Sequence, residues 1–194
     1  MRFLLAILAG AVVLFTWGAA FWMTIGNNAV KPLATEDAVM AMVNEKVPAD
    51  GAYFFPAPAT KDQAAIDAWQ AKHKAGPIGM LLVHKDGREP MDPKTFIQGG
   101  LISLVVATLL MVLMRMASPN GRFTNRLTAA VLAGVVAAIG THGLQWNWFY
   151  FPTTYTMYLL IDVAGSWTLA GAVMAVVMGR PKGVGQVVGT VKTG

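Results

Sequence analysis

The sequence predicts a mainly α-helical membrane protein, with four transmembrane helices and a small α/β extramembrane insertion between the first and second helices. Hydrophobic residues make up 55% of the 194 positions and charged residues only 13%, whereas a soluble domain normally carries about a quarter charged residues. The mean hydropathy is +0.52, and the apolar residues gather in four runs, each near the roughly 20 residues that cross a bilayer as a helix. Because the chain contains no cysteine, disulfides, thiolate metal sites and cysteine catalysis are excluded.

The first apolar run, residues 3–25, has two interpretations. It is longer than the apolar core of a typical signal peptide (about 7–15 residues), and Trp17 and Trp22 are typical of an interfacial anchor. We therefore predict an uncleaved transmembrane helix; the alternative is a signal peptide cut after "GAA", before Phe21. The other three predicted spans are residues 96–114, 127–145 and 154–178.

Lysine and arginine residues predict the orientation of the spans. The two termini and the loop at residues 115–126 contain basic residues and no acidic residue, whereas residues 26–95 carry nearly balanced charges. By the positive-inside rule, both termini are cytoplasmic in a bacterial inner membrane, and residues 26–95 and 146–153 face the periplasm or the exterior. The net charge of +5 then favours anionic lipid headgroups over nucleic acid as partners. Residues 179–194 are basic and rich in glycine, which predicts a flexible tail. The cytoplasmic basic residues are Arg2, Arg115, Arg122, Arg126, Arg180, Lys182 and Lys192.

Residues 26–95 have the pattern of a small α/β domain. Thr35 precedes two acidic residues and predicts the N-cap of a helix that ends near Lys46. Thr60 and Gln63 form a capping-box pattern that opens a second helix. A segment of about 70 residues is marginal for independent stability, so we expect it to rest on the ends of the spans.

Two short strands are predicted in the same segment, at residues 51–57 and 78–90, the second ending in a turn at Asp86–Gly87. His73 and His84 stand among lysines, with no second ligand at metal-binding spacing. They are therefore predicted as surface histidines.

Aromatic residues crowd the predicted outer turn, "WNWFYF". Tryptophan and tyrosine concentrate where membrane meets water, so the main interpretation is an interfacial belt. The clustering is denser than anchoring requires, which also indicates a contact surface for other membrane-protein subunits and leaves open a bound lipid, quinone or pigment. The belt residues are Trp17, Trp22, Trp146, Trp148, Phe149, Tyr150, Phe151 and Tyr155.

Asp162 and His142 are the polar residues of note inside the predicted spans. A buried aspartate costs about 2.5–3.5 kcal/mol on insertion scales, so it needs a partner. The two residues lie at similar predicted depths on antiparallel neighbours, and we expect them to pair across a seam of small residues. The pair acts either as a structural lock, which we favour, or as a proton relay. The stripe consists of Ala130, Gly134 and Ala138 on the third span and Ser166 and Ala170 on the fourth.

Several stretches together resemble a family of uncharacterised bacterial four-span inner-membrane proteins. They are "FTWGAAFWM", "GAYFFP", "HKAGPIGMLLVHKDGREPM" and "WNWFYFPTTYT" with "DVAGSWTLAG". The resemblance implies the same four-span topology and brings no activity or catalytic residue with it.

No nucleophile–base set, paired carboxylates, metal-ligand cluster or cofactor motif is recognisable in the sequence. We therefore predict a non-catalytic accessory subunit or assembly factor of a larger inner-membrane complex of the respiratory or photosynthetic kind, without a cofactor of its own. Two alternatives stay open. One is a small proton-coupled transporter that uses Asp162 and His142, and the other is a membrane enzyme that acts on lipid or quinone at the aromatic rim.

Overall fold

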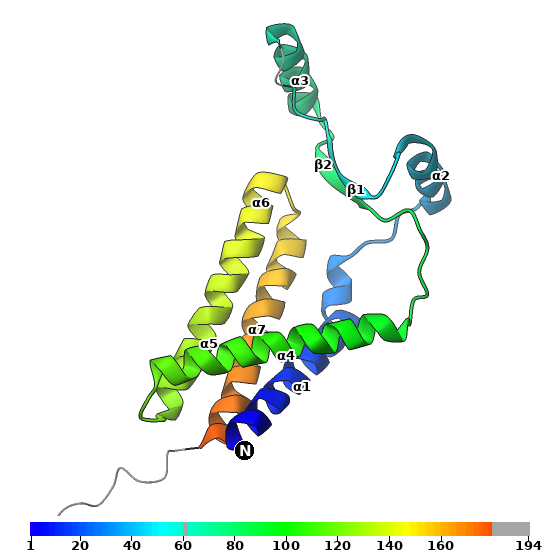
Figure 1. Cartoon of the computed structure of the whole chain (residues 1–194). Helices are drawn as coiled ribbons and strands as arrows, with labels where there is room; N and C mark the ends of the chain where they lie inside the picture. Colours follow the sequence, from blue (N-terminus) through cyan, green and yellow to red (C-terminus); the bar gives the residue numbers. More distant parts are fainter. Residues whose placement is uncertain (60–61, 180–194) are drawn as a thin grey trace, which may run out of the picture. The chain divides into compact units, whose positions relative to one another are not determined.

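The computed structural model describes residues 1–59 and 62–179. Within this part, the chain is mainly helical and contains four helices long and apolar enough to cross a membrane, together with a two-stranded sheet (Figure 1). These four helices, predicted from the apolar runs, are compatible with a multi-pass membrane protein. In chain order the elements are α1 (Arg2–Met23), η1 (Gly26–Ala29), α2 (Glu36–Lys46), β1 (Gly51–Phe55), α3 (Gln63–Ala75), β2 (Gly79–Val83), α4 (Pro93–Ala117), α5 (Phe123–Ala138), η2 (Ile139–Gly143), α6 (Leu144–Phe149) and α7 (Thr153–Met178).

The third long helix ends later than predicted. It passes from α5 through a π-helical turn, η2, into α6 and ends at Phe149. Residues 146–149, predicted as part of the outer turn, are therefore helical. The chain leaves the helix at Tyr150, which adopts a left-handed conformation (φ 57°), and Pro152 disfavours helical conformation in the residue before it.

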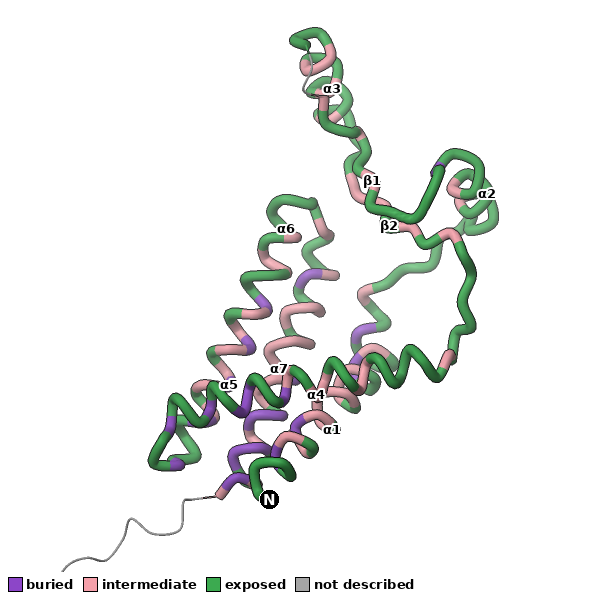
Figure 2. Tube along the Cα trace, in the orientation of Figure 1, coloured by how far each residue is buried: buried purple, intermediate pink, exposed green. Residues whose placement is uncertain are grey.

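Contacts divide the chain into two compact units, which are described separately. The first contains Met1–Ala20, Phe96–Ala137 and the chain from Asp162. Its core is built from alanine, which permits close helix packing, and from methionine, whose flexible side chain fills irregular gaps. Many of its other apolar side chains are exposed (Figure 2), as expected of helices that face lipid. The core residues are Ala6, Leu110, Met111, Met114, Ala130, Met174, Ala175 and Met178.

Helices α5 and α7 pack closely within this unit. A Cβ atom added at Gly171 would collide with the Cβ of Ala130, and one added at Gly134 would lie 2.7 Å from the Cβ of Trp167. Both glycines therefore hold positions where the neighbouring helix leaves no room for a side chain.

The second unit contains Phe21–Thr95 and Ala138–Ile161. The insertion thus clusters with the ends of long helices. Its strands β1 and β2 pair antiparallel, with Gly51 opposite Val83 and Phe55 opposite Gly79. Helix α2 has the predicted bounds, although the Thr35 side chain makes no capping hydrogen bond.

Helix α3 begins differently from the prediction. Asp62 is its N-cap, and the carboxylate accepts a 2.8 Å hydrogen bond from the backbone N–H of Ala65. Gln63 is the first helical residue and donates to Asp67; Thr60, the predicted partner of Gln63 in a capping box, lies outside the described residues. An aspartate satisfies the free N–H groups of a first turn as well as a threonine does.

Candidate functional site

Four aromatic residues at the end of the third long helix are substantially exposed. The exposed fractions are 48% for Trp146, 69% for Trp148, 37% for Phe149 and 50% for Tyr150. Large apolar rings are normally buried when no partner or lipid covers them. This end of the helix is therefore the strongest candidate for an interaction site.

Contacts inside the second unit hold three of these rings in place. The indole N–H of Trp146 donates to the Thr153 hydroxyl at 3.1 Å. Phe149 stacks on Phe54 of strand β1, with 5.7 Å between ring centroids. Tyr150 meets His73 of helix α3 edge-on at 5.4 Å. We call the set Phe54, Phe55, Trp146, Trp148, Phe149 and Tyr150 the aromatic surface.

Tyr150 has a backbone conformation that favours glycine. Its φ of 57° lies in the left-handed region, which costs a residue with a side chain about 1–3 kcal/mol and persists where the surroundings enforce it. Glycine at this position would relieve the strain but would lose the ring contact with His73. The contact with His73 is one of the surroundings that hold Tyr150 in this conformation.

A small cavity of about 210 Å³ lies beneath the aromatic surface. Phe54, Trp69, His73 and Trp148 line it, and Trp69 packs edge-on against His73 at 5.6 Å. The Nε1 atom of Trp69 is buried without a hydrogen-bond partner among the described residues. A ligand with an oxygen acceptor would satisfy this donor. His73, predicted as a surface histidine, is partly buried within the aromatic contacts.

The remaining belt residues form ring contacts near the ends of α1 and α7. Trp22 lies 6.3 Å from Tyr155, and Tyr155 lies 6.0 Å from Phe151. Phe21 is buried and lies 6.3 Å from Tyr158. Sequence reasoning missed Phe21 and Tyr158, although Phe21 stands next to Trp22 and Tyr158 follows Tyr155 by three residues.

Asp162 has a partner that the sequence did not predict. In the first unit, Trp17 Nε1 donates to Asp162 Oδ1 at 2.9 Å. The ring of Trp17 lies against Gly165, where an added Cβ would be 3.0 Å from Cζ2. Trp17, predicted as an anchor at the bilayer boundary, thus joins helix α1 to helix α7.

His142 lies in the π-helical turn η2, and its Nδ1 is 2.8 Å from Oε1 of Gln145. Its pairing with Asp162 stays a prediction. π-Helical turns occur frequently at functional sites. The glycines on either side, Gly140 and Gly143, are the sequence signal that could have indicated an irregular turn.

The predicted small-residue stripe is largely buried, including Ser166 and Ala170. The close approaches between α5 and α7 join Ala130 to Gly171 and Gly134 to Trp167. Ala138, one helical turn farther on, is buried as well.

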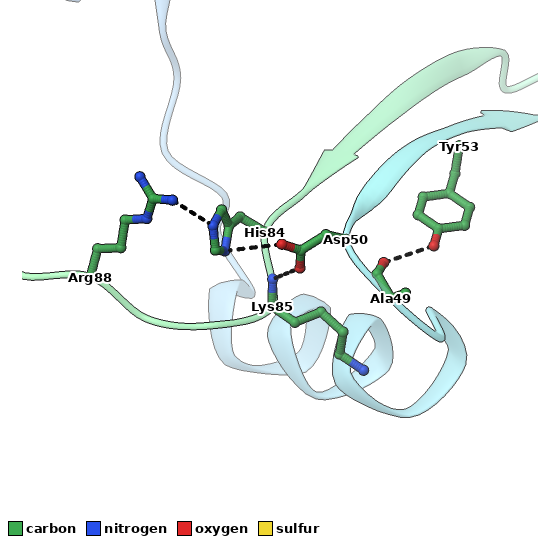
Figure 3. A network of polar contacts seen from close by, with 6 residues as sticks. All are labelled: Ala49, Asp50, Tyr53, His84, Lys85 and Arg88. Atoms are coloured by element: carbon green, nitrogen blue, oxygen red, sulfur yellow. Dashed lines mark hydrogen bonds and ion pairs between the residues drawn. The ribbon is translucent and has the colours of Figure 1, made fainter. Parts of the chain in front are cut away.

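A polar network ties the strands to helix α2 in the second unit (Figure 3). The carboxylate of Asp50 accepts a 2.7 Å hydrogen bond from the backbone N–H of Lys85 and lies 3.5 Å from Nδ1 of His84. Nη2 of Arg88 is 2.8 Å from Nε2 of His84, which makes Nε2 the acceptor. Lys85 Nζ donates to the Asn44 and Val47 carbonyls.

This network has the geometry of a structural clasp. His84 is exposed, as predicted, and the Asp50 carboxylate holds the start of β1 to the end of β2. Across residues 1–59 and 62–179, no three histidine, aspartate or glutamate side chains gather as a metal-binding group.

Comparison of the chain with models of known protein families, with curated proteins and with solved structures finds no match.

Proposed function

We propose that this protein is a non-catalytic accessory or assembly subunit of a larger complex in a bacterial inner membrane, and that the aromatic surface binds a neighbouring subunit. The carrying observation is that Trp146, Trp148, Phe149 and Tyr150 are exposed while three of them are held by fixed contacts. Tryptophan and tyrosine dominate the binding energy of protein interfaces. Rings that are already fixed lose little side-chain entropy on binding.

The contacts of Asp162 support a structural role for the polar groups in the long helices. Its carboxylate accepts from Trp17. The two hydroxyls that follow it along α7 donate to carbonyls of their own helix, Ser166 to Val163 at 3.0 Å and Thr168 to Ala164 at 2.7 Å. The protons of both hydroxyls are engaged within α7, and these contacts favour a lock over the proton-coupled transporter.

Photo-crosslinking tests the proposed contact in the native membrane. A photoreactive phenylalanine analogue replaces Trp148 in one strain and Leu132, an exposed residue in the middle of α5, in a second strain. The proposal predicts crosslinks to a defined protein from position 148 and to lipid alone from position 132. Lipid adducts alone at both positions would leave the aromatic surface as a membrane anchor and would overturn the proposed function.

The cavity beneath the aromatic surface supports a second candidate, binding of a lipid or quinone. The specific observation is the buried Nε1 of Trp69, which has no acceptor among the described residues. An ester or quinone carbonyl is an acceptor of suitable chemistry. Mass spectrometry of organic extracts from the purified protein checks this candidate: a retained quinone or lipid that disappears in Trp69→Phe supports it, and identical extracts contradict it.

A further inference from the structure

A second cavity, in the first unit, lies between the last turns of helix α4, the start of helix α5 and the N-terminal turn of helix α1. Its volume is about 630 Å³, within the range of about 300–1,000 Å³ that small-molecule sites occupy. Phe3, Val112 and Met116 supply apolar walls, and all three are exposed on their other sides. Arg115, Ser118 and Arg126 supply the polar part of the lining.

Arg126 is buried, with only 4% of its surface exposed. Its Nη1 donates to the carbonyl of Gly179 at 2.8 Å, but its Nε has no hydrogen-bond partner among the described residues. A buried guanidinium is stable only when its charge and its donors are matched. The donors of Arg126 are therefore incompletely used at the wall of a cavity.

Arg115 brings a second positive charge to the same cavity, and its guanidinium lies 4.4 Å from the ring centroid of Phe3. This cation–π contact orients the planar group. Two guanidiniums that line one cavity repel each other, and an anion between them offsets this repulsion.

Apart from Asp162, the first unit offers no side-chain carboxylate for this purpose. Asp162 is the only acidic residue after residue 95. It is bound to Trp17 and lies in α7 about 25 Å along the helix from Gly179, at 1.5 Å per residue. The first unit therefore supplies no further carboxylate to offset these two charges, which points to an anion bound from outside this unit.

We propose that this cavity binds the headgroup of an anionic phospholipid. Arginine matches phosphate oxygens with paired N–H donors, and Arg115 and Arg126 both line this cavity. The exposed apolar walls fit an acyl chain that continues into the bilayer. The basic residues of the loop and ends also predict that this end of the helices faces the cytoplasm, where basic pockets between helices bind acidic headgroups. The inference is independent of the proposed partner contact.

Native mass spectrometry of the purified full-length protein tests the site. The protein is delipidated in mild detergent and offered phosphatidylglycerol, phosphatidylcholine or inorganic phosphate. The expected result is one retained phosphatidylglycerol, with about tenfold weaker retention in Arg115→Gln, because a charge-assisted hydrogen bond contributes enough for a factor of ten. Arg126→Lys keeps the positive charge but loses the paired N–H donors of the guanidinium, and it should also weaken the retention of phosphatidylglycerol.

Arg122→Gln is the matched control, because it removes the same charge from an exposed position between α4 and α5 that does not line the cavity. It should retain phosphatidylglycerol like the wild type. Equal retention of phosphatidylcholine, or equal losses in Arg115→Gln and Arg122→Gln, would overturn the proposal. Saturation of the site by inorganic phosphate would also overturn it, because free phosphate would then be the ligand.

Discussion

The indole N–H of Trp17 donates a 2.9 Å hydrogen bond to the carboxylate of Asp162, which joins helix α1 to helix α7 across 145 positions of sequence. Gly165, one turn along α7, leaves room for the same ring. A hydrogen bond between helices in a membrane contributes about 0.6 kcal/mol on average. We expect this contact to fix the register of α1 against α7.

A double-mutant cycle measures this contact. Trp17→Phe removes the donor and also shortens the ring that lies against Gly165, while Asp162→Ala removes the acceptor. Each change should lower the free energy of unfolding in detergent by about 1–3 kcal/mol, and the pair should cost clearly less than the sum. The control cycle combines Thr16→Val with Asp162→Ala. The Thr16 hydroxyl donates to its own helix, so the effects of these two changes should be additive. Additivity in both cycles would show that the contact contributes nothing.

A second double-mutant cycle tests whether His142 pairs with Gln145 or with Asp162. The structure places Gln145 at 2.8 Å from its ring, and the sequence predicts Asp162. His142→Ala with Gln145→Ala should show a coupling energy of about 0.5 kcal/mol or more, measured by thermal unfolding in detergent. Coupling of His142 to Asp162 alone would contradict the Gln145 contact and would support the pairing predicted from sequence.

The close approach of α5 and α7 gives a prediction about residue size. Gly171→Ala places a methyl group against Ala130 and should lower the free energy of unfolding by about 1–3 kcal/mol through overpacking. Adding Ala130→Gly should recover much of this loss, because it reopens the space. Gly18→Ala, where no atom lies within 4 Å of the added Cβ, should be neutral or stabilising. Equal effects of Gly171→Ala and Gly18→Ala would show that the helices do not meet at Gly171.

The distribution of arginine and lysine predicts the orientation of the helices. A reporter enzyme that is active only in the cytoplasm should be active when it is fused after Gly194. A reporter enzyme that is active only outside the cytoplasm should be active when it is inserted near Gly51. The opposite result at either position would contradict the placement of both termini in the cytoplasm.

The positions of the four long helices could be predicted from the sequence, because apolar runs of sufficient length determine them. The contact of Trp17 with Asp162 could not, because hydropathy does not determine how far each helix is rotated about its axis. The end of the third helix was also missed. "WNWFYF" suits a membrane boundary whether it forms a turn or, as here, mostly helix, and only the left-handed Tyr150 decides where the helix stops.

The aromatic surface was predicted only in part. Its α6 residues are adjacent in sequence and stand out as a cluster. Phe54 and His73 come from strand β1 and helix α3, and their contacts with Phe149 and Tyr150 depend on tertiary packing that no local pattern reports. The cavity that lies beneath them could therefore not be inferred from sequence.

The most direct test of the proposed function is the size of the native assembly. Membranes that contain the full-length protein are solubilised in mild detergent and separated on a native gel, and the wild type should migrate in a large complex with co-purifying subunits. The Trp146→Ala/Trp148→Ala double variant should insert normally and leave the complex, since interface aromatics commonly contribute 2 kcal/mol or more, or about 30-fold in affinity. A wild-type protein that migrates alone, or a double variant that stays in the complex, would contradict the account.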